Sequence, residues 1–292
     1  MTLELFDPKA GTAPPMDSRT SISDTRQPVL GRIGSLETRL AASRQEIEAA
    51  QLIRYRVFVE EMGAELPPEA MRARRDFDAF DDICDHLIVL DTAIEGDSAE
   101  QIVATYRILR QEVAVRHSGF YSASEFDIAP LIARHPDKQF MELGRSCVLP
   151  PYRTKRTVEL LWQGNWAYAL KYNLGVMFGC ASFPGRVAEL HALALSFLHH
   201  NTLATGEWAV SAIGPHARNM DLMPPEAVNG KRALMAMPPL VKGYLRLGAM
   251  VGEGAVVDHA FGTTDVLIVL PVESISSRYV NYYGADAQRF AS

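Results

Sequence analysis

The feature that most constrains the fold is an apolar segment, residues 140–149, that contains two opposite charges and ends at a pair of prolines. Its apolar content predicts a strand, but Glu142 and Arg145 stand three positions apart, which in a regular strand places them on opposite faces. A bulge near Gly144 would bring both to one side and turn a backbone N–H out of the ladder. We therefore expect a carboxylate, a guanidinium and a free amide around one point. The alternative is a partly buried ion pair in an ordinary strand.

Length, charge and cysteine content narrow the class of protein. The chain has 292 residues, of which 48% are hydrophobic, and this suits one large domain or two small ones. A formal net charge of -6 argues against a nucleic-acid binder, because such proteins are usually basic. Cys84, Cys147 and Cys180 are odd in number and far apart. We therefore expect buried thiols in a reducing compartment, and neither a disulfide framework nor a metal site.

The ends of the chain carry no recognisable targeting signal. No apolar run approaches the roughly 18 residues of a membrane-spanning helix, and the N-terminus lacks a basic-then-apolar signal pattern. We expect a cytoplasmic protein, with peripheral contact at a membrane left open. Residues 1–30 are rich in Pro, Ser, Thr, Asp and Gly and are predicted to be disordered. A single domain is expected over residues 31–273, followed by a tail, 274–292, in which tyrosines pack peripherally.

Hydrophobic periodicity predicts helices and strands that alternate along the domain. Ser43 and Glu46 have the capping-box spacing of a helix start. Further helices are predicted at 154–172, 187–200 and 235–247, and the predicted strands are 86–91, 102–109, 140–149, 176–181, 208–213, 255–258 and 265–270. This alternation predicts an α/β protein with a mixed sheet and helices on both faces. The Gly-rich turn of a dinucleotide fold and the Walker sequence are both absent.

Several charged residues stand in apolar or acidic surroundings. Arg54 lies in the apolar helix that begins near residue 43, and Phe58 follows one turn later. Asp78 and Asp81 belong to an acidic cluster that either lines a pocket for a cation or forms a solvated loop. Arg107 points away from the apolar face of its strand, toward solvent or a cleft.

Three cations, Arg153, Lys155 and Arg156, begin the helix predicted at 154–172. Because helix N-termini favour anions, each cation there opposes the helix dipole at a cost of about a few tenths of a kcal/mol. This arrangement favours a site for a phosphate or an acidic partner, and incidental surface charge is the alternative. A second basic cluster contains Arg72, Arg74 and Arg75.

Taken in order, these charged residues resemble a known set. Arg54 with Phe58, then Asp78 to Asp81, Arg107, and Glu142 to Arg145 resemble the residues shared by acyl-homoserine-lactone synthases and their relatives. The sequence as a whole is most similar to L-ornithine N-acyltransferases, and the resemblance covers residues 36–271. It is carried by residues 142–148, 152–163, 179–184 and 238–249.

The resemblance implies a fold and a reaction. The fold would be that of a GNAT N-acyltransferase, with a mixed central sheet flanked by helices and a C-terminal extension. The reaction would transfer a 3-hydroxyacyl group from acyl carrier protein to the α-amine of L-ornithine. The product would be lyso-ornithine lipid, in the first step of ornithine lipid synthesis, and a separate O-acyltransferase would finish the lipid. A peripheral place at the inner membrane would suit release of this product.

One departure from ordinary GNAT enzymes bears on the acyl donor. Their strand-to-helix loop carries two glycines that let backbone amides cradle the coenzyme A pyrophosphate, and here Arg156 and Val158 stand in their place. These side chains would crowd that approach, which favours the single phosphate of a phosphopantetheine arm on an acidic carrier. No bound cofactor is expected. Arg153, Lys155 and Arg156 would then dock the carrier, with the cluster at 72–75 as the second candidate.

The resemblance also suggests roles at the reacting centre. Glu142 would act as general base or orient the amine, and a bulge amide near Gly144 would stabilise the oxyanion. Arg145 would hold the carrier's phosphate or pair with Glu142. Asp78 and Asp81 would bind the second amine of ornithine. Arg54 or Arg107 would pair either with the substrate carboxylate or with those aspartates.

Three other functions compete with this one. The nearest is a synthase that makes an acyl-homoserine lactone from S-adenosylmethionine, or another acyl-carrier-dependent N-acyltransferase. A coenzyme A-dependent acetyltransferase fits less well, because the two glycines are missing. A module that binds an acyl carrier or a membrane surface without turnover belongs to a different class, and would bind unaffected by loss of Glu142.

Overall fold

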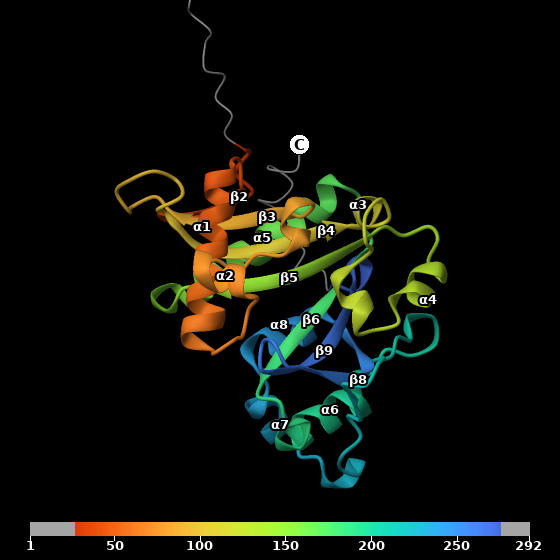
Figure 1. Ribbon diagram of the computed structural model, residues 1–292. Helices are drawn as coiled ribbons and strands as arrows, with labels where there is room; N and C mark the ends of the chain where they lie inside the picture. The colour runs from red at the N-terminus through yellow and green to blue at the C-terminus, as the bar shows by residue number, and fades with distance from the viewer. Residues whose placement is uncertain (1–26, 276–292) are drawn as a thin grey trace, which may run out of the picture.

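The computed structural model describes residues 27–275. Most of the segment 1–30 that is predicted to be disordered, and the packing of the tyrosines in 276–292, therefore lie outside the described range. Within that range the prediction is wrong at Leu30, which is buried and whose amide donates to the Thr38 carbonyl oxygen at 2.7 Å. The centre of the structure is a nine-stranded sheet with the order β1-β2-β3-β4-β5-β6-β9-β8-β7 (Figure 1). Among the nine described strands, only β5 and β6 pair in parallel. The strands are β1 Gly31–Ile33, β2 Leu36–Leu40, β3 Asp85–Asp91, β4 Ile102–Arg110, β5 Phe140–Val148, β6 Val176–Pro184, β7 Ala217–Arg218, β8 Met250–Asp258 and β9 Thr263–Pro271.

Helices cover both faces of this sheet, as expected (Figure 1). Successive residues of β3 point to opposite faces, and Leu87 joins the core under α5 whereas Ile88 packs with Ala50 and Ile53 of α1. In the C-terminal half, α8 packs on β6 and β9, and α6 packs on β8. The helices are α1 Arg44–Tyr55, α2 Pro68–Ala73, α3 Gln111–Ala114, α4 Ile128–Ala133, α5 Lys155–Lys171, α6 Ala192–Thr202, α7 Gly230–Ala236 and α8 Pro239–Leu247.

The two halves of the sheet separate between β5 and β6. These strands pair only from Phe140 to Glu142, opposite Val176 to Phe178, and then diverge (Figure 1). They stay close at Gly179, where an added Cβ would lie 2.1 Å from the carbonyl oxygen of Leu143. Beyond Glu142, β5 therefore has no strand partner on its β6 side among the described strands. We call this opening the wedge.

The predicted strands at 86–91, 102–109, 140–149, 176–181, 255–258 and 265–270 are confirmed, within a few residues at each end. Ser43 caps α1 as expected, because its hydroxyl accepts the Glu46 amide at 3.2 Å. The second half of the predicted capping box is wrong. The Glu46 carboxylate instead accepts the Ala42 amide at 2.6 Å and pairs with Arg39, because Arg39 offers a buried charge partner.

Three predicted elements are corrected. The strand predicted at 208–213 is a loop that makes isolated bridges at Ser211 and Ala212. The helix predicted at 235–247 is two helices, α7 and α8, because Pro238 and Pro239 cannot continue a helix from the preceding turn. Residues 188–191 form a 3₁₀ turn ahead of α6.

The helix predicted at 154–172 is confirmed as α5. Val158 is 46% exposed, whereas Leu160, Leu161 and Tyr168 are buried. Gly164 sits so close to β3 that an added Cβ would lie 2.8 Å from the side chain of Leu87. This close contact sets which face of the helix meets the sheet.

Across residues 27–275, none of the helices has both the length and the apolar character that crossing a bilayer requires.

Candidate active site

Three arginines and three aspartates form one ion-pair network where α1, β4 and β5 meet. Arg54 of α1 is fully buried, and its Nε donates to Asp76 Oδ2 at 2.8 Å. Its Nη2 donates to Asp81 Oδ2 at 3.0 Å and lies 2.8 Å from Asp81 Oδ1. A buried charge is tolerated when it is paired and hydrogen-bonded in this way.

Arg107 of β4 and Arg145 of β5 reach the same aspartates. Arg107 Nη1 donates to Asp78 Oδ1 at 2.6 Å and to Asp81 Oδ2 at 3.1 Å. Arg145 Nη2 donates to Asp78 Oδ2 at 3.3 Å. The sequence left open whether Arg54 and Arg107 pair with a substrate carboxylate or with these aspartates. In the structure, both arginines pair with aspartates.

The network holds the Asp81 carboxylate in the charged form. Although burial opposes ionisation, the charges of Arg54 and Arg107 lower the pKa of Asp81 to about 2. Asp78 is part-exposed, and its carboxylate also accepts the Phe80 amide at 2.9 Å. A substrate ammonium at Asp78 or Asp81 would therefore compete with guanidinium groups that are already bound.

The bulge predicted in β5 is confirmed, one residue later than expected. Gly144 lies opposite Arg107 and Cys147 opposite Thr105, so two residues of β5, Arg145 and Ser146, face one residue of β4. The left-handed residue is Arg145, with φ 52°, and not Gly144. An added Cβ at Gly144 would meet nothing within 4 Å.

The bulge aims the Arg145 side chain between two aromatic rings. Its guanidinium carbon lies 4.4 Å from the centroid of Phe261 and 4.9 Å from that of Tyr121. Phe58 packs edge-on against Phe261, with centroids 5.6 Å apart. Phe58 belongs to a π-helical turn, Arg56–Glu61, that continues α1, and such turns often occur at functional sites.

Glu142 lies on the same side of the sheet as Arg145, but its carboxylate binds a loop and not Arg145. Its carboxylate accepts the amides of Tyr121 and Ser122 at 2.8 and 2.7 Å, and also the Ser122 hydroxyl. Burial raises the pKa of Glu142, and these three donors partly oppose that rise. The carboxylate is thus both oriented and more basic than an exposed one.

The predicted carrier-docking cations differ in their surroundings. Arg153 makes two hydrogen bonds of 2.6 Å to Glu61, and Lys155 pairs with Glu159 at 3.1 Å. Arg156 is exposed, and no ion pair to it is seen within residues 27–275. In the second cluster, Arg72 is exposed, Arg74 pairs with Glu60 and Arg75 pairs with Glu48 at 2.9 Å.

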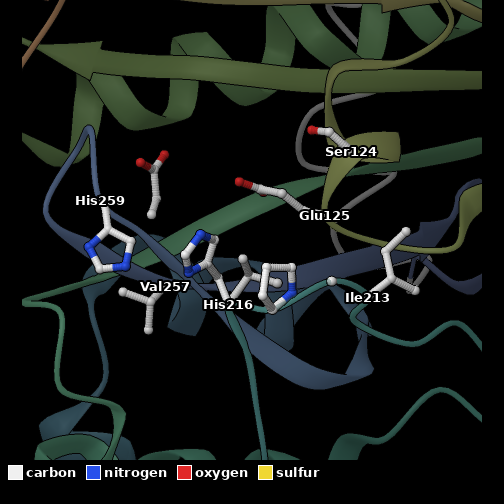
Figure 2. A pocket seen from close by; sticks show the side chains of 10 residues that line it. Ser124, Glu125, Ile213, His216, Val257 and His259 are labelled. Carbon is white, nitrogen blue, oxygen red and sulfur yellow. The ribbon is translucent and has the colours of Figure 1, made fainter.

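A pocket that the sequence did not predict lies beside the network. Its volume is about 190 Å³, and three separate segments line it: residues 124–125, 213–216 and 256–259 (Figure 2). Glu125 points into it from the loop that Glu142 holds, opposite His216 and His259 (Figure 2). Two of these segments contain an acidic residue, Glu125 and Asp258, but nothing in the sequence indicates that the segments meet.

Glu125 heads a second group of titratable side chains. Its carboxylate, the Cys180 thiol and the Asp265 carboxylate lie within 4.8 Å of one another. Burial, with the charges of Asp265 and Asp258, raises the pKa of Glu125 to about 7. Burial raises the pKa of Asp265 to about 6. Burial also raises the pKa of the Cys180 thiol, which donates to Glu125 Oε2 at 3.5 Å.

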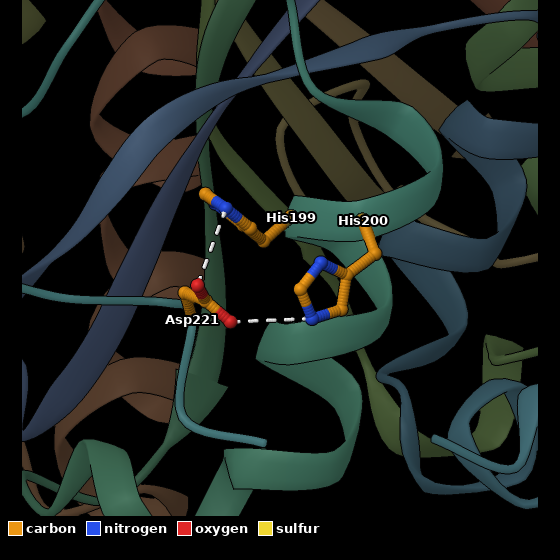
Figure 3. Close-up of side chains that lie close together, drawn as sticks. All are labelled: His199, His200 and Asp221. Atoms are coloured by element: carbon orange, nitrogen blue, oxygen red, sulfur yellow. Dashed lines mark ion pairs between the residues drawn. The ribbon is translucent and has the colours of Figure 1, made fainter. Parts of the chain in front are cut away.

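His199 and His200 lie in the last turn of α6, and both face Asp221 (Figure 3). His200 Nε2 lies 3.2 Å from Asp221 Oδ1 and 2.9 Å from the Met223 carbonyl oxygen. A carbonyl oxygen can only accept, so His200 Nε2 carries the hydrogen of this bond. The hydrogen bond ties α6 to the segment 221–223.

Comparison with known proteins identifies the family. A family model described as "Acetyltransferase (GNAT) domain" matches residues 53–163. The L-ornithine N(alpha)-acyltransferase of Rhizobium meliloti (strain 1021) is 67% identical over 100% of this chain and 99% of its own. The enzyme of that name from Rhodobacter capsulatus is 40% identical over 85% of this chain and 95% of its own. This chain belongs to the L-ornithine N(alpha)-acyltransferase family.

As a member of this family, the chain is an N-acyltransferase of the GNAT fold. Solved structures of similar fold are more distant. FeeM, an N-acyl amino acid synthase from uncultured soil microbes, is 12% identical, with a TM-score of 0.46 over 82% of this chain and 91% of its own. The AHL synthase LasI is 10% identical, with a TM-score of 0.44 over 85% and 95%.

Proposed function

We propose that the chain transfers a 3-hydroxyacyl group from an acyl carrier protein to the α-amine of L-ornithine and releases lyso-ornithine lipid at the cytoplasmic face of the inner membrane. The observation that carries this proposal is the 67% identity, over the full length, to a relative named for that acceptor. No bound cofactor takes part, because the acyl thioester is itself the activated donor.

In this reaction the neutral α-amine attacks the thioester carbonyl, a C–N bond forms and the C–S bond breaks. The amine gives up a proton, and the thiolate that leaves takes one up. Glu142 accepts the amine proton, directly or through water, and its raised pKa suits it to this role. A backbone amide at the bulge of Arg145 and Ser146 stabilises the oxyanion.

Two features support a phosphopantetheine arm as donor. The wedge leaves one edge of β5 free beyond Glu142, and the arm carries two amides that pair with a free strand edge. Exposed Arg156 stands where ordinary GNAT enzymes need glycine, so the loop suits one phosphate better than a pyrophosphate. Arg145 is paired with aspartates, which leaves the phosphate to the cations before and within α5.

The test is a mass-resolved acylation assay with purified protein. It pairs 3-hydroxyacyl carrier protein or the matching acyl coenzyme A with L-ornithine or S-adenosylmethionine. We expect acyl-ornithine from the carrier thioester, at a rate that falls about 100-fold or more in Glu142→Gln. A lactone from S-adenosylmethionine, or acylation from coenzyme A alone, would contradict the proposed acceptor or donor.

Ser122→Ala is the matched control for Glu142→Gln. It removes the hydroxyl donor but keeps the carboxylate and both backbone donors. We expect Ser122→Ala to keep the alkaline rise of the pH–rate profile and Glu142→Gln to lose it. Equal profiles in the two variants would mean that Glu142 only holds the loop.

A further inference from the structure

The pocket beside the network combines unsatisfied negative charge with an open volume. Glu125 and Asp258 line it, and Asp265 lies directly behind Glu125. Asp265 is only 6% exposed, and its Oδ1 has no hydrogen-bond partner within the described part of the chain. Thr263 and Ser182 serve as hydrogen-bond partners of this carboxylate, but a buried carboxylate oxygen without a partner is costly, so a cation in the neighbouring pocket would stabilise Asp265.

The protein supplies little positive charge to these three carboxylates. None of the ten residues that line the pocket is a lysine or an arginine. The charge of Arg145 lowers the pKa values of Glu125 and Asp265 only in part, and its guanidinium is bound to Asp76 and Asp78. The raised pKa values of Glu125 and Asp265 agree with this shortage of cations.

The remaining walls fit a short aliphatic chain. His216 and His259 pack against each other with centroids 4.8 Å apart, and Ile213 and Val257 contribute apolar surface (Figure 2). The Asp258 carboxylate uses one oxygen, Oδ1, to accept the amides of Ala260 and Phe261. This holds the side chain in place and leaves Oδ2 for a ligand.

The pocket is also tied to the proposed reacting centre. Glu142 holds the amides of Tyr121 and Ser122, and the Ser122 carbonyl accepts the Glu125 amide at 3.0 Å. The residue proposed to receive the α-amine proton therefore fixes the turn that carries Glu125. An amino acid with its α-amine at Glu142 would therefore lie close to this turn.

We propose that this pocket selects the acceptor, with Glu125 and Asp258 binding the terminal ammonium of its side chain and Asp265 adding negative charge from behind. This inference rests on the proposed function, because it requires that the acyl acceptor is an amino acid. It replaces Asp78 and Asp81, which arginines already occupy, as the site for the second amine.

Two measurements on the full-length protein test this inference. Calorimetric titration compares binding of L-ornithine with that of L-norvaline, which has the same chain without the terminal amine. We expect the wild type to prefer ornithine, and Glu125→Gln and Asp258→Asn each to reduce that preference about tenfold or more. Norvaline binding should change little. Glu253→Gln, an exposed carboxylate on β8 outside the pocket, is the matched control and should retain the preference.

The acylation assay with the same two acceptors separates this inference from the proposed function. Selective binding that depends on Glu125 and Asp258, without acylation of ornithine, would support the pocket and contradict the proposed function. Acylation of ornithine with an unchanged preference over norvaline in both variants would overturn the pocket and leave the function standing. Equal binding of the two ligands by the wild type would also overturn the inference.

Discussion

Asp81 illustrates, for a single residue, how one carboxylate can hold two buried arginines. It is only 5% exposed and meets both Arg54 and Arg107. Asp81→Asn keeps the shape but leaves Arg54 with less compensating charge in the interior. We expect the free energy of unfolding to fall by about 3–5 kcal/mol, measured by urea denaturation at pH 7. Asp82→Asn, at an exposed neighbour, should change it by less than about 0.5 kcal/mol.

The same carboxylate predicts an acid-dependent loss of stability. Its pKa is lowered to about 2 in the folded protein, so its contribution is present above the unfolded pKa of about 4. That contribution is lost as the pH falls from about 4 to 2. Stability of Asp81→Asn should therefore depend less on pH in this window than that of the wild type. Parallel curves for the two proteins would contradict the assignment.

The contribution of Glu125 to stability should change with pH in the opposite direction to that of Asp81. Because its pKa is raised to about 7, the folded state binds the proton more tightly than the unfolded state does. Its charged form therefore costs stability increasingly as the pH rises from about 4.5 to 7. We expect Glu125→Gln to be more stable than the wild type by about 1–2 kcal/mol at pH 8, and similar at pH 4, in thermal unfolding. A destabilised variant at pH 8 would show that another group already pairs with Glu125.

At the scale of elements, β5 and β6 make one close backbone contact just beyond the residues that pair, where the two strands begin to separate. A methyl group at Gly179 would lie 2.1 Å from the Leu143 carbonyl oxygen, so β6 would have to move away from β5. We expect Gly179→Ala to lower the free energy of unfolding by about 1–3 kcal/mol and to slow acylation, since the wedge would change shape.

Gly144→Ala is the matched control on the facing strand. The added methyl would meet nothing within 4 Å, and the left-handed backbone of the bulge belongs to Arg145. Its free energy of unfolding should stay within about 0.5 kcal/mol of the wild type. Equal destabilisation by the two substitutions would mean that the contact at Gly179 is not what sets the wedge.

At the scale of the whole molecule, a net charge of -6 makes docking of an acidic carrier depend on local cations. We expect Arg156→Glu to raise the KM for the acyl carrier protein by about threefold to tenfold at low salt. The effect should shrink in high salt, where the charges are screened. Steady-state kinetics at two ionic strengths would measure this. Arg246→Glu, an exposed cation on α8, should have little effect, and an equal effect would mean that only total charge matters.

The sequence alone determined most strands, the boundaries of α5, the bulge in β5 and the family. These depend on neighbours along the chain: alternation, helix periodicity, caps and an ordered series of charged residues. It also singled out Arg54, Asp78, Asp81, Arg107 and Arg145, which the structure brings into one network. It missed β1 and β2, which are short and pair along the edge of the sheet.

Only the tertiary structure decided which charge meets which. Arg54 lies 22 residues from Asp76, and Glu125 lies 140 residues from Asp265, so no local pattern indicates either meeting. The same holds for the wedge, which arises because β5 and β6 pair over three residues and then separate. The pocket exists because three distant segments converge. Side-chain chemistry can be anticipated from the chain, but partners, burial and the resulting pKa values depend on how the sheet brings those segments together.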